Sequence, residues 1–313
     1  MSSTRTTTHR LTHLATTRPA VALWAALGLT ALAGCGSSSD PSAVSAAGGA
    51  TIAPLPSSTA MSGTKGIAGT AEHMADPGKG LLASEKDLTL KPTSTALRPG
   101  AQTVSFQVLN ASGQPQTDYA VDATKLLHFY LVRQDLTGFQ HLHPTLSNGT
   151  WSIAVGALTP GPYRMYTDFV AKDSKGAQSP AVLSTALIVA GSYTPTLLPA
   201  AASGNTADGL TATMSGSITD GTQSKVTLQH TDNGKPVNDL ETYLDSFAHM
   251  TALHTGDLAY QHIHPGLTAT PGQKGGPALP FEVDLPEKGT WRLFLQVQRA
   301  GALHLLPLTV TVS

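Results

Sequence analysis

Cysteine is almost absent from this chain, because Cys35 is the only one among 313 residues. Disulfide frameworks and zinc sites built on cysteine pairs need at least two thiols. The blue-copper centre needs one free cysteine inside the folded protein. If Cys35 is consumed by lipidation, as its position described below indicates, all three kinds of site are excluded, and a metal would have to be held by nitrogen or oxygen.

Charge and catalytic motifs are equally sparse. Charged residues make up 12% of the chain, and the formal net charge is −1. Nucleic-acid partners are not expected, because their binding needs a basic surface. The chain has no Gly-x-Ser-x-Gly elbow, no Walker loop, no His-Glu-x-x-His helix and no cysteine nucleophile. The sequence therefore does not predict an enzyme.

The N-terminus has the layout of a secretory signal. Three arginines within the first 18 residues precede the apolar run of residues 20–33, which is shorter than the roughly 20 residues of a spanning helix. The run closes on "LAGC", residues 32–35, which resembles the lipobox of bacterial lipoproteins. We expect residues 1–34 to be removed and Cys35 to carry a lipid that anchors the protein in the cell membrane on its extracytoplasmic side. The alternative is an ordinary signal peptide with a chance cysteine.

Removal of residues 1–34 takes away three arginines and no acidic residue. That leaves 16 basic against 20 acidic residues, a formal net charge of −4. Residues 36–80 are mostly Gly, Ser, Ala, Thr and Pro, a composition that buries too little apolar surface to offset its ordering entropy. We therefore expect residues 35–84 to form a disordered tether.

Beyond residue 85 the chain consists of strand-length apolar or alternating runs separated by turn residues. No long helical period competes with them. The expected strands are Thr103–Leu109, Leu126–Val132, Trp151–Val155, Tyr163–Val170 and Leu183–Val189, followed by Leu210–Ser217, Lys225–His230, Phe247–His254, Phe281–Leu285, Trp291–Gln298 and Leu305–Val312. The pattern predicts an all-β fold of two tandem antiparallel β-sandwiches, residues 85–191 and 192–313.

The two halves are copies of each other. "FQHLHP" at residues 139–144 returns as "YQHIHP" at residues 260–265, and one further histidine lies thirteen positions before the first His of each motif. These positions, and several Gly, Pro and Asp before them, are 121 residues apart. Further on, Gly161 and Gly289 are 128 apart, so the second copy carries about seven extra residues, which we place in a surface loop at residues 268–280.

The repeated spacing predicts a converging histidine triplet in each copy. Alternate residues of a strand share a face. With a two-residue turn at Asp135–Leu136 in the first copy and at Gly256–Asp257 in the second, the upstream histidine lies opposite the last one, on the same face. A three-residue turn would send it to the other face. The two triplets are His128, His141 and His143, and His249, His262 and His264.

Three neutral imidazoles on a rigid patch suit copper, zinc or nickel. We expect a copper or zinc ion in each triplet, and favour the second, where His304 and Met250 are possible additional ligands. The alternative is that His-x-His-Pro is a structural element at a sandwich corner, since duplication copies structural residues as faithfully as functional ones. Exposed histidines would favour metal binding, and histidines buried among aromatics with satisfied hydrogen bonds would favour the structural role.

The stretch "DLETYLDSFAHMTALHTGDLAYQHIHP" resembles a group of bacterial secreted proteins and lipoproteins with a Tyr-Leu segment followed by a His-x-His-Pro hairpin. The resemblance covers residues 234–313 well and residues 113–190 more loosely, because "YAVDATKLLH" lacks the Tyr-Leu segment. It implies an Ig-like or cupredoxin-like sandwich, similar in layout to extracytoplasmic metal-handling proteins of the copper-resistance type.

Two main functions follow from these observations. The first is a membrane-tethered protein that buffers copper or zinc, or passes it to another metal-handling envelope protein. The alternative is a metal-free Ig-like interaction module of the envelope. A third reading, a metallo-oxidase or hydrolase centre on the triplets, would need an open coordination position.

Overall fold

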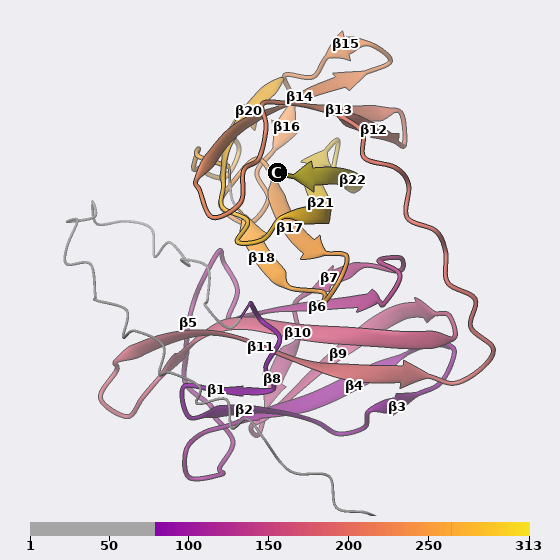
Figure 1. Cartoon of the computed structure of the whole chain (residues 1–313). Coiled ribbons are helices and arrows are strands. Elements are labelled where there is room, and N and C mark those ends of the chain that lie inside the picture. Colours follow the sequence, from indigo (N-terminus) through magenta and orange to yellow (C-terminus); the bar gives the residue numbers. More distant parts are fainter. Residues whose placement is uncertain (1–78, 264) are drawn as a thin grey trace, which may run out of the picture. The chain divides into compact units, whose positions relative to one another are not determined.

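The computed structural model describes residues 79–263 and 265–313 (Figure 1). The expected signal peptide, Cys35, most of the expected tether and His264 lie outside these residues. Every regular element in the described ranges is a β-strand, and these ranges contain no helix long and apolar enough to cross a bilayer.

The first repeat consists of two facing sheets with mostly antiparallel pairing. The first sheet contains, in spatial order, β1 (Ser84–Glu85), β2 (Leu88–Pro92), β4 (Gly100–Leu109), β9 (Thr150–Leu158) and β8 (Thr145–Ser147). The second sheet contains β3 (Ala96–Leu97), β11 (Gln178–Val189), β10 (Gly161–Lys172), β6 (Leu127–Arg133) and β7 (Gln140–Leu142), with β5 (Tyr119–Ala120) also on β10.

The second repeat has the same design. One sheet contains β12 (Gly204–Ala207), β13 (Leu210–Ser215), β14 (Ser224–Asp232) and β20 (Ala278–Val283), with the short β15 (Lys235–Pro236) on β14. The other contains β18 (Tyr260–Ile263), β17 (His249–His254), β21 (Gly289–Arg299) and β22 (Ala302–Val312), with β16 (Leu240–Glu241) on β21 and β19 (Lys274–Gly275) on β16. The predicted all-β class and tandem sandwiches are confirmed.

The internal repeat is visible in the strand order. In the first copy β7, β6, β10 and β11 lie side by side, and in the second copy β18, β17, β21 and β22 do. The seven-residue insertion is not purely a loop, because residues 268–280 include β19 and the start of β20. Pairing with β16 and β14 therefore holds part of a segment that we expected to be irregular.

Each sandwich has its own apolar core, formed by the inward side chains of its two sheets. Phe106, Trp151 and Phe169 are buried in the first core, and Phe281 and Trp291 are buried in the second. Along β4 burial alternates residue by residue, as expected for a strand with one solvent face. In β6, by contrast, residues 127–132 are all buried, so both faces of this strand are covered.

A third apolar cluster contains residues of both repeats. Tyr130 and Tyr166 of the first repeat belong to it, together with Tyr260 and Phe294 of the second. Phe139 stacks on Phe294 with ring centroids 4.0 Å apart and planes 5° apart. The second face of β6 is therefore buried against residues of β17, β18 and β21, and the histidines lie on this face.

The described chain begins with a short segment that contacts both repeats, residues 79–83, here called the N-terminal strap. The carbonyl of Lys79 accepts a hydrogen bond from the amide of Tyr260, and the carbonyl of Leu82 accepts one from the amide of Ser184. Gly80 has φ of +60°. The strap falls within the range that we assigned to the tether.

Candidate metal centre

Both His-x-His hairpins have the register that their spacing predicts. In the first, Tyr130 pairs with His141 and Leu131 with Gln140. In the second, Thr251 pairs with His262 and Met250 with Ile263. These registers are the ones given by a two-residue turn, so each upstream histidine shares a face with the first histidine of its motif.

The first triplet is gathered in one place. Ring centroids lie 5.3 Å apart for His128 and His141, 5.1 Å for His128 and His143, and 4.8 Å for His141 and His143. In the second triplet the centroids of His249 and His262 lie 4.3 Å apart. The third member, His264, is outside the described residues.

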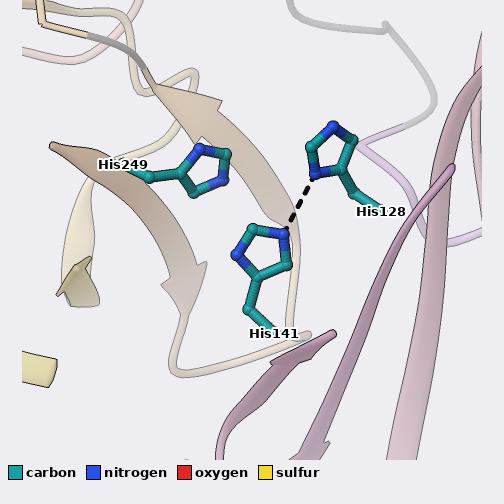
Figure 2. Close-up of side chains that lie close together, drawn as sticks. All are labelled: His128, His141 and His249. Carbon is teal, nitrogen blue, oxygen red and sulfur yellow. Dashed lines mark hydrogen bonds between the residues drawn. The ribbon is translucent and has the colours of Figure 1, made fainter. Parts of the chain in front are cut away.

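The two triplets lie next to each other. The centroids of His141 and His249 are only 4.5 Å apart, and one ligand nitrogen from each of His128, His141 and His249 lies within 4.8 Å of the other two. Figure 2 shows these three rings facing one another from strands of both repeats. The packing of the two repeats brings the triplets into one place, here called the histidine cluster: His128, His141, His143, His249 and His262.

Burial keeps the three histidines of the first repeat uncharged. His128 and His249 are 0% exposed and His141 is 7% exposed. Burial, reinforced by the neighbouring histidines, lowers the pKa of His128 to about 4, and burial lowers the pKa of His143 to about 3. The pKa of His141 is lowered well below its ordinary value for the same reasons. Neutral imidazole is the form that binds a metal.

In the first repeat the outer nitrogens of the rings are held by hydrogen bonds that fix the tautomers. Nε2 of His128 donates to the carbonyl oxygen of Asp122 at 3.2 Å, and Nδ1 of His141 donates to Oε1 of Gln296 at 2.7 Å. A neutral imidazole carries one proton, so the inner nitrogens carry lone pairs. These two atoms, Nδ1 of His128 and Nε2 of His141, lie 3.1 Å apart.

The second repeat has the same arrangement. Asp168 can only accept, and its Oδ2 receives both Nδ1–H of His262 and the hydroxyl of Tyr260, each at 3.0 Å. The hydroxyl of Tyr130 forms a hydrogen bond with Nε2 of His249 at 3.1 Å. The inner atoms are Nδ1 of His249 and Nε2 of His262, 3.4 Å apart.

His143 supplies a further ring nitrogen that could bind a metal. Its Nε2 is buried and has no hydrogen-bond partner among the described residues. A buried nitrogen without a partner carries a desolvation cost of about 1–3 kcal/mol. Together the inner nitrogens form an imidazole donor set, which fits copper, zinc or nickel.

Sequence reasoning missed the residues that orient the rings. Asp168 on β10 and Gln296 on β21 are 128 residues apart and occupy the same place in the two copies. Each bonds a histidine of the other repeat: Asp168 bonds His262, and Gln296 bonds His141. The available signal was an acidic residue inside the expected strand "YRMYTDFV".

Two suggested additional ligands are elsewhere. Met250 follows His249 in β17, so it points to the opposite face, and it is buried in the core of the second sandwich. His304 lies on β22 opposite Val297, and its polar neighbour is Asp208, with Nδ1 3.7 Å from Oδ2. Neither belongs to the histidine cluster.

A second group of potential ligands lies on the surface. His254, Asp257 and Glu287 place ligand atoms within 4.8 Å of one another. Glu287 already forms an ion pair with Lys79, and Nδ1 of His254 lies 2.9 Å from Asp257 Oδ1. These partners satisfy the group without a metal.

Comparison with known proteins gives one family. The family described as "Domain of unknown function (DUF8832)" matches residues 83–185 and 205–313, more than half of the chain. The chain belongs to the DUF8832 family. The two matched segments correspond to the two repeats of this DUF8832 protein, and the family description gives no metal or activity. No curated protein matches.

Solved structures with some likeness to this DUF8832 protein are distant. They include an Escherichia coli alpha-2-macroglobulin, 13% identical with a TM-score of 0.22 over 72% of this chain and 22% of that one. The BSP domain of a biofilm associated protein is 14% identical with a TM-score of 0.20 over 72% and 30%. A titin fragment is 9% identical with a TM-score of 0.19 over 70% and 61%. The chain spans less than two thirds of the length of each, and likenesses at these scores say nothing of function.

Proposed function

We propose that this protein binds a transition metal, copper or zinc, through the histidine cluster. One observation supports the proposal most directly: Nδ1 of His128 and Nε2 of His141 face each other at 3.1 Å while both outer nitrogens donate elsewhere. Two lone pairs at this distance repel. A cation between them turns the repulsion into two coordinate bonds.

The metal-free alternative accounts for the burial and for the outer hydrogen bonds, because a structural histidine would have both. It accounts less well for the inner nitrogens. Without a metal, the pair of His128 and His141 needs an added proton, which burial disfavours, or a change in an outer hydrogen bond, such as a turned Gln296 amide. The unpartnered Nε2 of His143 adds a further desolvation cost. A bound ion would remove both the repulsion between the inner nitrogens and this desolvation cost.

The proposal includes a cellular setting. The lipobox-like sequence at Cys35 and the Gly/Ser-rich segment after it support a lipid anchor that holds the sandwiches outside the membrane. There the protein would buffer copper or zinc, or pass it to another metal-handling envelope protein, as the resemblance to copper-resistance proteins suggests. The role is binding rather than catalysis, with no nucleic-acid partner.

The test is metal uptake by the protein purified without a histidine tag. Elemental analysis and titration with Cu(II) and Zn(II) are made on the wild type and on the His141→Ala/His262→Ala variant, with His254→Ala/His304→Ala as the matched control. We expect uptake by the wild type and the control and its loss in the cluster variant, with the circular dichroism spectrum unchanged. Absence of uptake by the wild type would overturn the proposal.

A further inference from the structure

The histidine cluster is built as two equivalent halves, and this bears on how many ions it holds. We infer that the centre is dinuclear, with one copper or zinc ion in each repeat, held by the inner nitrogens of that repeat's own histidines. The inference rests on the proposed function and adds the number of ions and the division of ligands between them.

The nitrogen separations fit one ion in each repeat. Two ligands that each lie 2.0–2.1 Å from a shared ion, at ligand angles of 90–110°, have nitrogens about 2.9–3.4 Å apart. The separation is 3.1 Å between His128 Nδ1 and His141 Nε2, and 3.4 Å between His249 Nδ1 and His262 Nε2. The same pair of atom types is used in both copies.

The ring of His143 lies at a spacing that suits a third ligand in the first repeat. For imidazoles on one ion with these bond lengths and angles, ring centroids lie about 4.5–5.3 Å apart. The three centroid distances among His128, His141 and His143 run from 4.8 to 5.3 Å. The ring of His143 is crossed against the other two, at 79° and 68°, and its Nε2 is the buried atom without a partner.

Ring orientation favours pairing His249 with His262. An imidazole lone pair lies in the plane of its ring, so stacked parallel rings do not direct their lone pairs to a common point. His249 is stacked on His128, with planes 15° apart, and on His141, with planes 24° apart. The planes are 32° apart for His128 and His141 and 47° apart for His249 and His262. His249 is therefore tilted more against the histidine of its own repeat than against those of the other.

Charge balance sets a further condition on the pair of ions. Asp168 is 1% exposed, and its Oδ2 accepts hydrogen bonds from His262 and Tyr260. Two divalent ions in buried surroundings need more negative charge than one carboxylate provides. A hydroxide bridging the ions meets this need, and bridged pairs are typically about 3.5–4 Å apart.

The first test is stoichiometry. Wild-type full-length protein is loaded with excess Zn(II), freed of loose metal by gel filtration and analysed for zinc per chain. We expect two ions. One ion per chain would overturn the dinuclear inference and leave the proposed function standing, and no zinc and no copper would overturn both.

Half-site variants test the division of ligands. His128→Ala/His141→Ala removes the first half, His249→Ala/His262→Ala removes the second, and His254→Ala/His304→Ala is the matched control. We expect one ion in each half-site variant and two in the control. Loss of all metal from either half-site variant, with its fold intact by circular dichroism, would mean one shared site and would overturn the inference.

Two milder substitutions keep the test decisive if the histidine variants do not fold. Asp168→Asn changes only the group that orients His262, and Gln296→Leu changes only the group that orients His141. Loss of such an orienting partner typically weakens metal binding about 10–100-fold. We expect each variant to weaken one of the two binding steps and to leave the other unchanged. An equal loss in both steps would overturn the inference.

Copper gives an independent spectroscopic readout. Two bridged Cu(II) ions couple magnetically, so the integrated paramagnetic resonance signal of the loaded wild type should fall well below its copper content. The half-site variant His249→Ala/His262→Ala should show a signal equal to its single copper. Full signal intensity from a wild type that carries two copper ions would overturn the bridged pair.

Discussion

Tyr130 links the two repeats through a single hydroxyl group. It forms a hydrogen bond with Nε2 of His249, and its ring lies 5.1 Å from that of Tyr260, which donates to Asp168. A residue of the first repeat therefore holds one ring nitrogen of His249.

Tyr130→Phe is expected to destabilise the protein by about 1–3 kcal/mol, because it leaves buried hydrogen-bonding groups without a partner. It should also weaken metal binding, since the ring of His249 loses the hydroxyl group that holds its Nε2. Urea denaturation and metal titration measure the two effects. Tyr166→Phe is the matched control, because Tyr166 also donates across the repeats, to the carbonyl of Leu258, without contacting the cluster. An equal loss of metal affinity in both variants would contradict the assigned role.

The buried histidines predict how stability depends on pH. His128 and His143 titrate near 4 and 3 in the fold, against an ordinary pKa of 6.5. Between these values the unfolded chain binds more protons than the native one, so the free energy of unfolding rises with pH. For the metal-free protein we expect full stability above about pH 6.5 and a loss on acidification toward pH 4, on the order of 3 kcal/mol for His128 alone.

Urea denaturation in the presence of a chelator at pH 7, 5.5 and 4.5 measures this slope. His143→Gln should flatten this dependence on pH, because one group with a lowered pKa is removed, and His304→Ala is the control outside the cluster. A wild-type stability that is flat from pH 7 to 4.5 would contradict the buried, neutral state of His128 and His143.

Gly80 in the N-terminal strap has no room for a side chain. A Cβ there would lie 2.8 Å from Cγ1 of Val182 and 3.2 Å from Cβ of Tyr260, at φ of +60°. We expect Gly80→Ala to lower the free energy of unfolding by about 1–2 kcal/mol from the backbone and by about 1–3 kcal/mol more from the clash. Gly113→Ala isolates the backbone part, because Gly113 has φ of +72° and open space around it. Equal losses of unfolding free energy in the two variants would mean that the strap moves to make room for the added methyl group.

At the scale of elements, matching turns precede the first histidine of each cluster half. Residues 122–125 form one turn and residues 243–246 form the other. In the first turn Ala123 and Thr124 have φ of +40° and +69°, a region that β-branched residues rarely adopt. This backbone conformation places the carbonyl oxygen of Asp122 where Nε2 of His128 can donate to it.

Thr124→Gly is expected to stabilise the protein by up to about 1 kcal/mol, because glycine adopts this conformation without the left-handed penalty and Thr124 is exposed. Thermal denaturation measures the gain. Asn148→Gly is the control, since Asn148 has φ of +48° and asparagine tolerates this region. A destabilised Thr124→Gly would show that the hydroxyl or methyl group of the threonine has a role of its own.

The strands and hairpin registers were predictable from sequence because they depend on local rules. Alternation of side chains and a two-residue turn are enough to pair Tyr130 with His141. The pairing of β19 with β16 was not predictable in the same way, because it joins Lys274 to Glu241 across more than thirty residues and involves only two residues of each strand.

At the scale of the whole molecule, the joining of the two triplets was missed. It depends on side chains that pack between the repeats, such as Phe139 on Phe294, and no local spacing specifies that contact. One signal was present, since "LLHFYLV" is apolar at nearly every position, which is typical of a strand covered on both faces. That pattern indicates a partner for the outer face but does not name it.

The lipobox makes a prediction for the intact protein. If Cys35 carries a lipid, the wild type should fractionate with membranes, and Cys35→Ser should be released or remain as an uncut precursor. Membrane fractionation with an immunoblot measures this. Moving the cysteine is the control: Cys35→Ser/Ser37→Cys should behave as Cys35→Ser does. Unchanged membrane association of Cys35→Ser would contradict the lipid anchor.

The reciprocal bonds of Asp168 and Gln296 have a consequence for the ancestry of the centre. In a symmetric homodimer, residue i of one subunit meets residue j of the other, and j meets i. The pairs Asp168–His262 and Gln296–His141 have this form, so an ancestor with a single repeat could build the centre by self-association. Such a dimer would carry two carboxylates or two amides. Fusion into one chain allowed the two halves to diverge. The metal should therefore bind first to the half that contains His262, beside the carboxylate of Asp168.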